Sequence, residues 1–155
     1  MLGEGSALFA MESAERASAD GHNVLARFHS FGSAHDAHAV NSFRLSGEGA
    51  ARAIAQALKE GGLSIDDIAF VVSGASGSRA GDQMELEALS RVFGTRLKEI
   101  PISAPKAAFG EVLGASGALG VATALQAFKR GAVPPTPGLD DPPAGLALSR
   151  DPQPV

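Results

Sequence analysis

Pro101-Ile-Ser-Ala-Pro-Lys-Ala-Ala-Phe-Gly-Glu-Val-Leu-Gly-Ala-Ser-Gly-Ala118 is the stretch that decides the fold of this chain. It predicts a short apolar strand over residues 100–103, followed by a turn with a single lysine, Lys106. A helix rich in glycine and other small residues is expected to follow over 115–130. Such an arrangement of strand, turn and glycine-rich helix entry is where α/β proteins hold ligands and reactive groups. Glycine also lets another backbone or a thin ligand arm come close.

The composition favours one globular domain and excludes several kinds of function. The 155 residues are 45% hydrophobic and 19% charged, which suits a packed α/β domain. The net charge of −4 argues against nucleic acid as a partner, because phosphate binding needs a basic surface. The sequence has no cysteine, so it has no disulfide, no thiolate metal ligand and no cysteine nucleophile. With neither a signal peptide nor an apolar run of roughly 20 residues, a cytoplasmic protein with no membrane segment is expected.

Apolar periodicity along the rest of the chain predicts strands that alternate with helices. This order is typical of an α/β fold with a mixed or largely parallel sheet. Residues 1–150 are expected to form a single domain and 151–155 a flexible tail. The predicted helices cover 14–20, 48–60 and 82–93 with one turn at 63–68, and the predicted strands cover 6–12, 23–31, 68–72 and 145–149.

Three local patterns suggest ligand sites, and each has a simpler explanation. His35 and His38 have metal-ligand spacing, but the segment is typical of a loop and offers only Asp36 as a further ligand. Residues 73–78 are rich in glycine and serine, but they lack the lysine and the spacing of a phosphate-binding loop. Gly3-x-Gly5 lacks the third glycine of a nucleotide fingerprint. We therefore expect no metal ion and no cofactor.

Motifs spread over nearly the whole chain keep a common order and spacing. Together they resemble the C-terminal half of a β-ketoacyl synthase, although the chain covers well under half of a complete synthase. These motifs are Gly3-Glu-Gly-Ser-Ala, Phe31-Gly, Gly62-Leu-Ser-Ile-Asp-Asp-Ile, Gly81-Asp82 with Glu85, Arg91-Val-Phe-Gly, Lys106, Gly110, Leu113-Gly-Ala-Ser-Gly-Ala118 and Gly131-Ala-Val-Pro-Pro-Thr136.

The resemblance implies half of a thiolase-like fold, with helices packed on a mixed sheet and truncation at both ends relative to the family. Enzymes of this family join acyl thioesters that are carried on acyl carrier protein. In them a cysteine from the N-terminal half is the nucleophile. Two histidines from the C-terminal half assist decarboxylation and stabilise the thioester oxyanion, and a lysine orients this set.

This chain departs from the family at both histidine positions. The resemblance places the first histidine at Gly74 and the second at Glu111, while the lysine position is kept as Lys106. The acidic residue usual further along the helix is replaced by Gly120. A decarboxylating site must donate hydrogen bonds or positive charge to a developing enolate. Glycine has no side chain that could donate a hydrogen bond. An ionised glutamate only accepts hydrogen bonds, and its negative charge repels an enolate. We therefore expect no ketosynthase catalysis by this chain alone.

The leading hypothesis is a non-catalytic subunit similar to the chain length factors of type II polyketide or fatty acid biosynthesis. It would pair with an active ketosynthase or an N-terminal half chain in a hetero-oligomer, and would meet acyl carrier protein through that complex. Unpaired strand edges and apolar helix faces in a half-sheet favour such a partner. Two alternatives stay open: an acyl-thioester transferase or hydrolase that uses Lys106 and Glu111, and a non-functional remnant. A purely structural ion pair between Lys106 and Glu111 is the simpler interpretation of these two residues.

Overall fold

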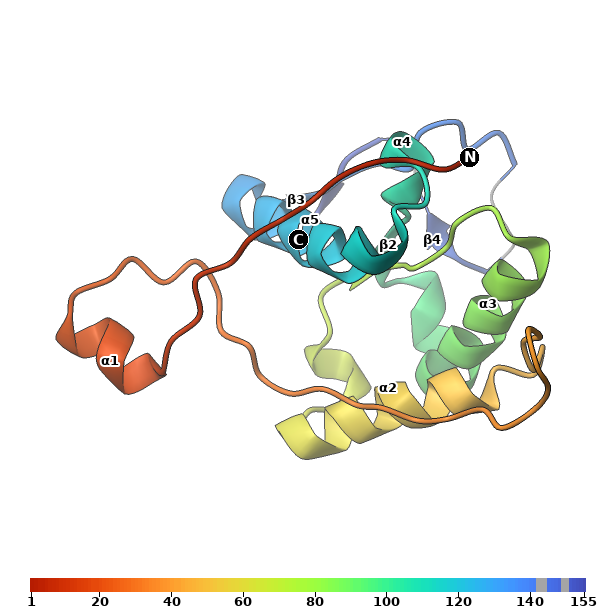
Figure 1. Cartoon of the computed structure of the whole chain (residues 1–155), viewed down its shortest axis with the longest axis horizontal. Helices are drawn as coiled ribbons and strands as arrows, with labels where there is room; N and C mark the ends of the chain where they lie inside the picture. Colours follow the sequence, from red (N-terminus) through yellow and green to blue (C-terminus); the bar gives the residue numbers. More distant parts are fainter. Residues whose placement is uncertain (142–144, 149–150) are drawn as a thin grey trace.

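The structure, a computed structural model, describes residues 1–141, 145–148 and 151–155. Figure 1 shows a body of helices around a small sheet, from which the segment carrying α1 projects. The helices are α1 (Ala14–Ala19), α2 (Glu48–Gly61), η1 (Ile65–Asp67), α3 (Arg79–Phe93), η2 (Gly94–Lys98), α4 (Lys106–Phe109), η3 (Leu113–Ala115) and α5 (Ser116–Arg130). The strands are β1 (Val71–Val72), β2 (Pro101–Ser103), β3 (Ala132–Val133), β4 (Ala147–Leu148) and β5 (Gln153–Pro154).

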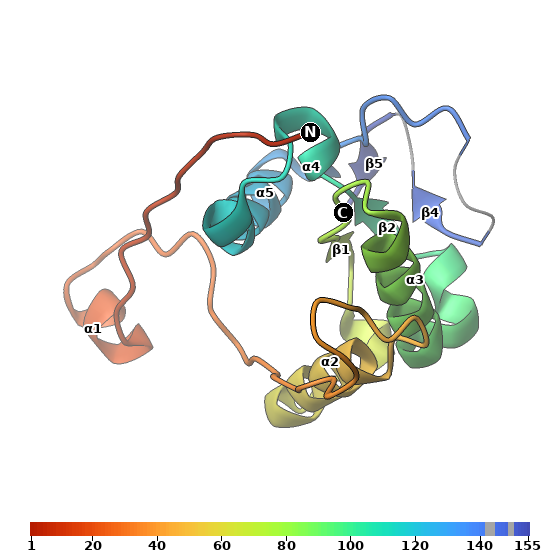
Figure 2. The same ribbon diagram turned by 45° about the vertical axis from the view of Figure 1, so that its right-hand side comes forward.

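Two small sheets form the strand layer. The first has the order β1-β2-β4 and is parallel throughout, with Val71 opposite Ile102 and Ile102 opposite Leu148. The second is the antiparallel pair β3-β5. Both parallel and antiparallel pairing are therefore present, as expected for the α/β class, and Figure 2 shows β1, β2 and β4 side by side.

Helices pack on both faces of the parallel sheet. The core cluster of Leu89, Phe93, Leu97, Ile100 and Ile102 joins α3 and η2 to β2. Adjacent residues of a strand point to opposite faces, and β1 shows this: Val71 packs against the core cluster, while Val72 approaches Gly120 of α5.

The predicted helices are confirmed, with small shifts at their ends. Helix α2 ends where Gly62 adopts the left-handed conformation at φ 62°, which a glycine reaches without strain. Helix α3 begins at Arg79 rather than at 82, because the Ser78 side chain accepts the backbone N–H of Gly81 and caps the helix earlier. The turn predicted at 63–68 is η1, with a capping box between Ser64 and Asp67.

The strands predicted at 6–12 and 23–31 are wrong for this structure. Neither segment contains a strand, and both lie largely in solvent, with Leu8 97% and Phe28 70% exposed. Alternation of apolar and polar residues is typical of a strand with one buried face. A strand also needs a neighbouring strand whose backbone forms hydrogen bonds with it. The described residues supply no such neighbour for either segment.

The C-terminal part contains two short strands. The strand predicted at 145–149 is present as β4, although residue 149 lies outside the described residues. Residues 153 and 154, within the segment predicted to be a flexible tail, pair with β3. The division into a domain of 1–150 and a tail of 151–155 stays a prediction.

Candidate functional site

The lysine turn connects β2 to α5 and places Lys106 and Glu111 face to face. Lys106 opens the single turn of α4, which ends at Gly110 with φ 80° and ψ −178°. Extended backbone with a positive φ is accessible essentially to glycine alone, so Gly110 fixes the direction in which the chain leaves the turn. Glu111 follows at once. Its carboxylate lies 2.7 Å from Lys106 Nζ, and both side chains are mostly buried.

Three donors surround the carboxylate of Glu111. Lys106 Nζ donates to Oε2, while the Ser116 hydroxyl and the Leu113 backbone N–H donate to Oε1 at 2.6 and 2.8 Å. The bond from Lys106 is the largest cause that lowers the pKa of Glu111 from its ordinary value of 4.5 to about 2, followed by those from Ser116 and Leu113. Glu111 is therefore ionised at neutral pH, where it is a poor proton donor and a very weak base.

The pH dependence of stability should report this network directly. A carboxyl group with a lowered folded pKa stabilises the fold above its unfolded value, here near 4.5, and this contribution is lost as pH falls through about 2. We expect Glu111→Gln to be less stable than the natural chain at pH 7, with a difference that shrinks between pH 4.5 and 2. Thermal unfolding measured at several pH values checks this, with Glu60→Gln on the exposed side of α2 as the control. A stability difference between the two proteins that stays constant from pH 4.5 to 2 would contradict a lowered pKa of Glu111.

The lysine turn also holds the start of the chain. Glu111 N–H donates to the Met1 carbonyl, and Gly3 N–H donates to the Glu111 carbonyl, which forms a parallel bridge at Leu2. A Cβ on Gly3 would lie 1.8 Å from the Phe109 carbonyl oxygen, so only glycine allows this approach. The Gly3 motif and the lysine turn, far apart in sequence, form one unit.

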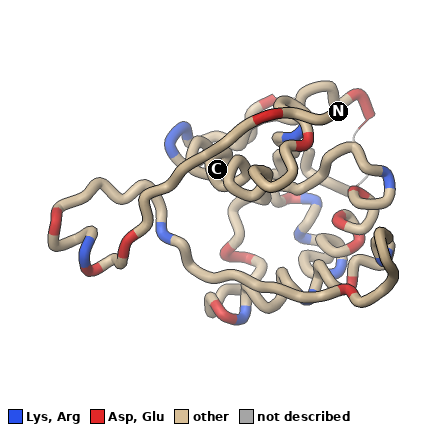
Figure 3. Tube along the Cα trace, viewed as in Figure 1, with Lys and Arg blue, Asp and Glu red and all other residues tan. Residues whose placement is uncertain are grey.

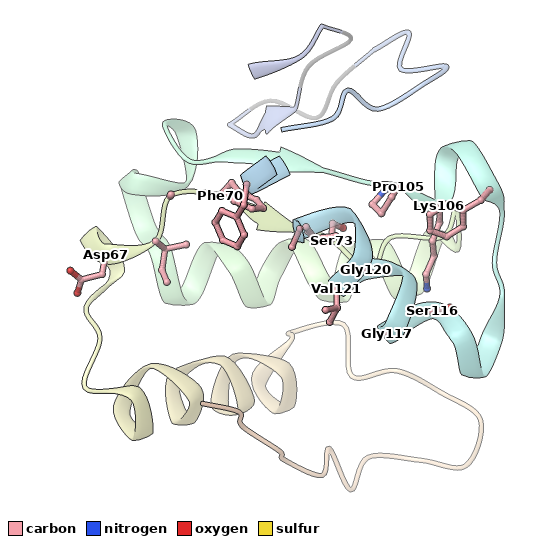
Figure 4. A pocket seen from close by; sticks show the side chains of 16 residues that line it. Asp67, Phe70, Ser73, Pro105, Lys106, Ser116, Gly117, Gly120 and Val121 are labelled. Carbon is pink, nitrogen blue, oxygen red and sulfur yellow. The ribbon is translucent and has the colours of Figure 1, made fainter. Parts of the chain in front are cut away.

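An open cleft of about 620 Å³ lies between β1, α4 and α5, and Lys106 is in its wall. Figure 4 shows the Lys106 side chain extending toward the first turn of α5, where Ser116 lies. Most of the other walls are apolar, including Phe70, Phe109 and Phe128. Glu111, which accepts a hydrogen bond from Lys106, is not among the residues that line the cleft.

Gly74 lies in the same cleft, at the end of β1. Its backbone N–H donates to Glu85 Oε1 at 2.8 Å, and the Ser73 hydroxyl donates to Glu85 Oε2 at 2.9 Å. A Cβ at Gly74 would meet only the Glu85 carboxylate at 3.7 Å or more, an ordinary contact. The backbone therefore does not require glycine at this position.

The loop 73–78 is held by two carboxylates of α3. Glu85 takes the hydrogen bonds described above, and Asp82 accepts the backbone N–H groups of Ser76 and Gly77 at 3.0 and 2.9 Å. These hydrogen bonds attach the loop to α3. Sequence reasoning missed Ser73, Ser116 and Glu85 as parts of the site, because their roles come from contacts between separate elements.

The structure brings together one further group of possible metal ligands among the described residues. Glu12, Asp20 and His22 have ligand atoms within 4.8 Å of one another, all exposed on the projecting α1 segment. Arg16 lies 3.8 and 3.4 Å from the two carboxylates and already supplies positive charge. The pair His35 and His38 is not part of any such group in the described chain.

Basic and acidic residues are spread along the described chain. Figure 3 shows Lys and Arg interspersed with Asp and Glu along the trace. None of the described helices is long and apolar enough to cross a membrane.

Comparison with known proteins places this geometry in a family. Residues 25–140 match the family described as "Beta-ketoacyl synthase, C-terminal domain". The chain belongs to this family. Nodulation protein E of Rhizobium sp. (strain N33) is 34% identical over 142 residues, which are 92% of this chain and 35% of that protein.

Two solved structures show the same fold. The ishigamide ketosynthase/chain length factor superposes with a TM-score of 0.86 at 28% identity, covering 96% of this chain and 36% of that chain. A type II polyketide synthase acyl-carrier protein in complex with its ketosynthase bound to the hexaketide gives a TM-score of 0.83 at 25% identity, covering 89% of this chain and 34% of that chain. The expected thiolase-like α/β fold is therefore confirmed. The chain spans about a third of the length of these ketosynthase relatives.

Proposed function

We propose that this chain is a non-catalytic ketosynthase-like subunit that acts, like a chain length factor, by pairing with an active ketosynthase or with an N-terminal half chain. The observation that carries the proposal is the state of Glu111. It stands where the family resemblance puts a histidine, and its carboxylate is fully engaged by Lys106, Ser116 and Leu113. A group held ionised in this way repels a developing enolate rather than stabilising it.

Gly74 and the lack of cysteine support the same proposal. The position that the resemblance assigns to the first histidine would accept a Cβ without a close contact, so the backbone does not require glycine there. These 155 residues contain no cysteine, so they do not supply the cysteine nucleophile that the family resemblance implies for a condensing reaction. In type II polyketide or fatty acid biosynthesis, the partner would then carry out the condensation and the present chain would have a structural role. Acyl carrier protein would contact the present chain only through the complex.

A partner is also supported by the apolar surface that the chain leaves open. The cleft wall of α5 and the extended segments near Leu8 and Phe28 present large apolar side chains to solvent. Surfaces of this kind are typical of protein interfaces. The second solved relative above is a complex of a ketosynthase with its acyl-carrier protein, and the first joins a ketosynthase with a chain length factor, so assemblies of both kinds exist for this fold.

Co-expression tests the proposal. A tagged chain expressed with a complete type II ketosynthase, or with a ketosynthase N-terminal half, is expected to elute with it as a stoichiometric complex in size-exclusion chromatography. The chain alone is expected to leave malonyl-acyl carrier protein unchanged, as followed by mass spectrometry. A folded monomer that ignores both partners would contradict the pairing.

The alternative of an acyl-thioester hydrolase or transferase has a separate test. Its candidate groups, Lys106 and Glu111, are bound to each other, which favours a structural ion pair. We expect no thioester turnover by the purified chain above the rate without protein. Turnover that disappears in Glu111→Gln would support the enzyme instead.

A further inference from the structure

A second groove, of about 740 Å³, lies between α2, η1 and α3, away from the lysine turn. Figures 1 and 2 both show α2 lying against α3. The floor of the groove is apolar, and its residues come from all three elements and the loop that joins the first two. They are Ala51, Ala55, Leu58, Leu63, Ile65 and Val92.

Three exposed cations stand at the edges of this floor. Arg52 and Lys59 are seven residues apart on α2, which puts them on the same side of the helix about 10 Å from each other. Arg91 also lines the groove and comes from α3. The groove therefore has positive charge on both of its walls.

No carboxylate neutralises these three cations among the ion pairs found in the described residues. Arg52 and Arg91 donate instead to the backbone carbonyls of His35 and Ser46, which fix the side chains without cancelling their charge. Glu48 is the acidic residue in the lining. Its carboxylate lies 3.9 Å from the guanidinium group of Arg44, which is not a lining residue of the groove. The positive charge is local, because the whole chain carries −4.

We propose that this groove binds an acidic amphipathic helix of a partner protein, with carboxylates two helical turns apart. An apolar stripe on such a helix covers the apolar floor, and carboxylates at i and i+7 match the spacing of Arg52 and Lys59. A second copy of this chain is disfavoured by its own net charge of −4. A flat lipid surface fits a concave groove poorly, and only three cations of the groove would attract its anionic headgroups. The inference does not rest on the proposed function.

The test uses the full chain and a fluorescein-labelled amphipathic peptide of roughly 18 residues, with leucines along one face and glutamates seven residues apart. Fluorescence anisotropy is expected to show binding that weakens as salt rises. Arg52→Glu/Lys59→Glu is expected to weaken it tenfold or more, since each attraction becomes a repulsion. Lys129→Glu/Arg130→Glu at the end of α5 changes the net charge equally and is the matched control.

The remaining outcomes are distinct. Equal losses in both double variants, or equal binding of a peptide with lysines in place of glutamates, would overturn the proposal. Binding to phosphatidylserine vesicles without binding to the acidic peptide would point to a membrane and overturn it as well. If circular dichroism shows that the double variant does not fold, Lys59→Glu alone must still lower the affinity at least twofold, because the Lys59 side chain donates no hydrogen bond among those described.

Discussion

Phe93→Ala is expected to lower the free energy of unfolding by about 3–5 kcal/mol, the largest effect of any single change considered. Phe93 is 4% exposed and lies in the core cluster with Leu89, Leu97 and Ile102. Its removal leaves a cavity where α3 and η2 meet the sheet, and the surrounding residues cannot close it fully. Because domains are stable by only about 5–15 kcal/mol, this single change removes a large share of the total stability.

Urea unfolding followed by circular dichroism measures this effect, on the chain alone or on its complex if it needs a partner. Phe31→Ala is the matched control, since Phe31 is 68% exposed. The control should change the stability by less than about 0.5 kcal/mol. If Phe93→Ala and Phe31→Ala behave alike, the assignment of the core is wrong.

Gly110→Ala is expected to destabilise the lysine turn by about 2 kcal/mol or more, because an L-residue in this backbone region costs about 1–3 kcal/mol. The new Cβ would also lie 2.9 Å from the backbone nitrogen of Gly3, so the first residues of the chain must move. The bridge at Leu2 and the hydrogen bonds of Glu111 to Met1 and Gly3 would weaken with it.

Limited proteolysis followed by mass spectrometry measures how well the N-terminal segment is held. In Gly110→Ala, faster cleavage before residue 12 is expected. Gly114→Ala is the control from the same stretch: its Cβ would meet nothing within 4 Å, and its φ is not positive. Equal cleavage in both variants would show that Gly110 does not hold the start of the chain.

The helices and the central strand were predictable because their signals are local. The apolar face of α2, its end at Gly62 and the Gly131 end of α5 are each encoded within a few neighbouring residues. The predictions for 6–12 and 23–31 failed because a strand is stabilised by a neighbour that the sequence of the segment does not contain.

The sequence also indicated some residues of the candidate site, but not which residues contact one another there. Spacing within the family motifs singled out Gly74, Lys106 and Glu111, and all three stay proposals as functional positions. Spacing did not reveal that Ser116 and the Leu113 N–H complete the set around Glu111, nor that Glu85 holds Ser73 and Gly74.

The sequence by itself determined the family and the helices, because motifs in a common order and local apolar patterns suffice for these. Only the tertiary structure decided what Glu111 does at the lysine turn. Its lowered pKa depends on donors from α4, η3 and α5 that meet around one carboxylate, and hydrogen bonds of this kind exist only where separate elements are brought within about 3 Å.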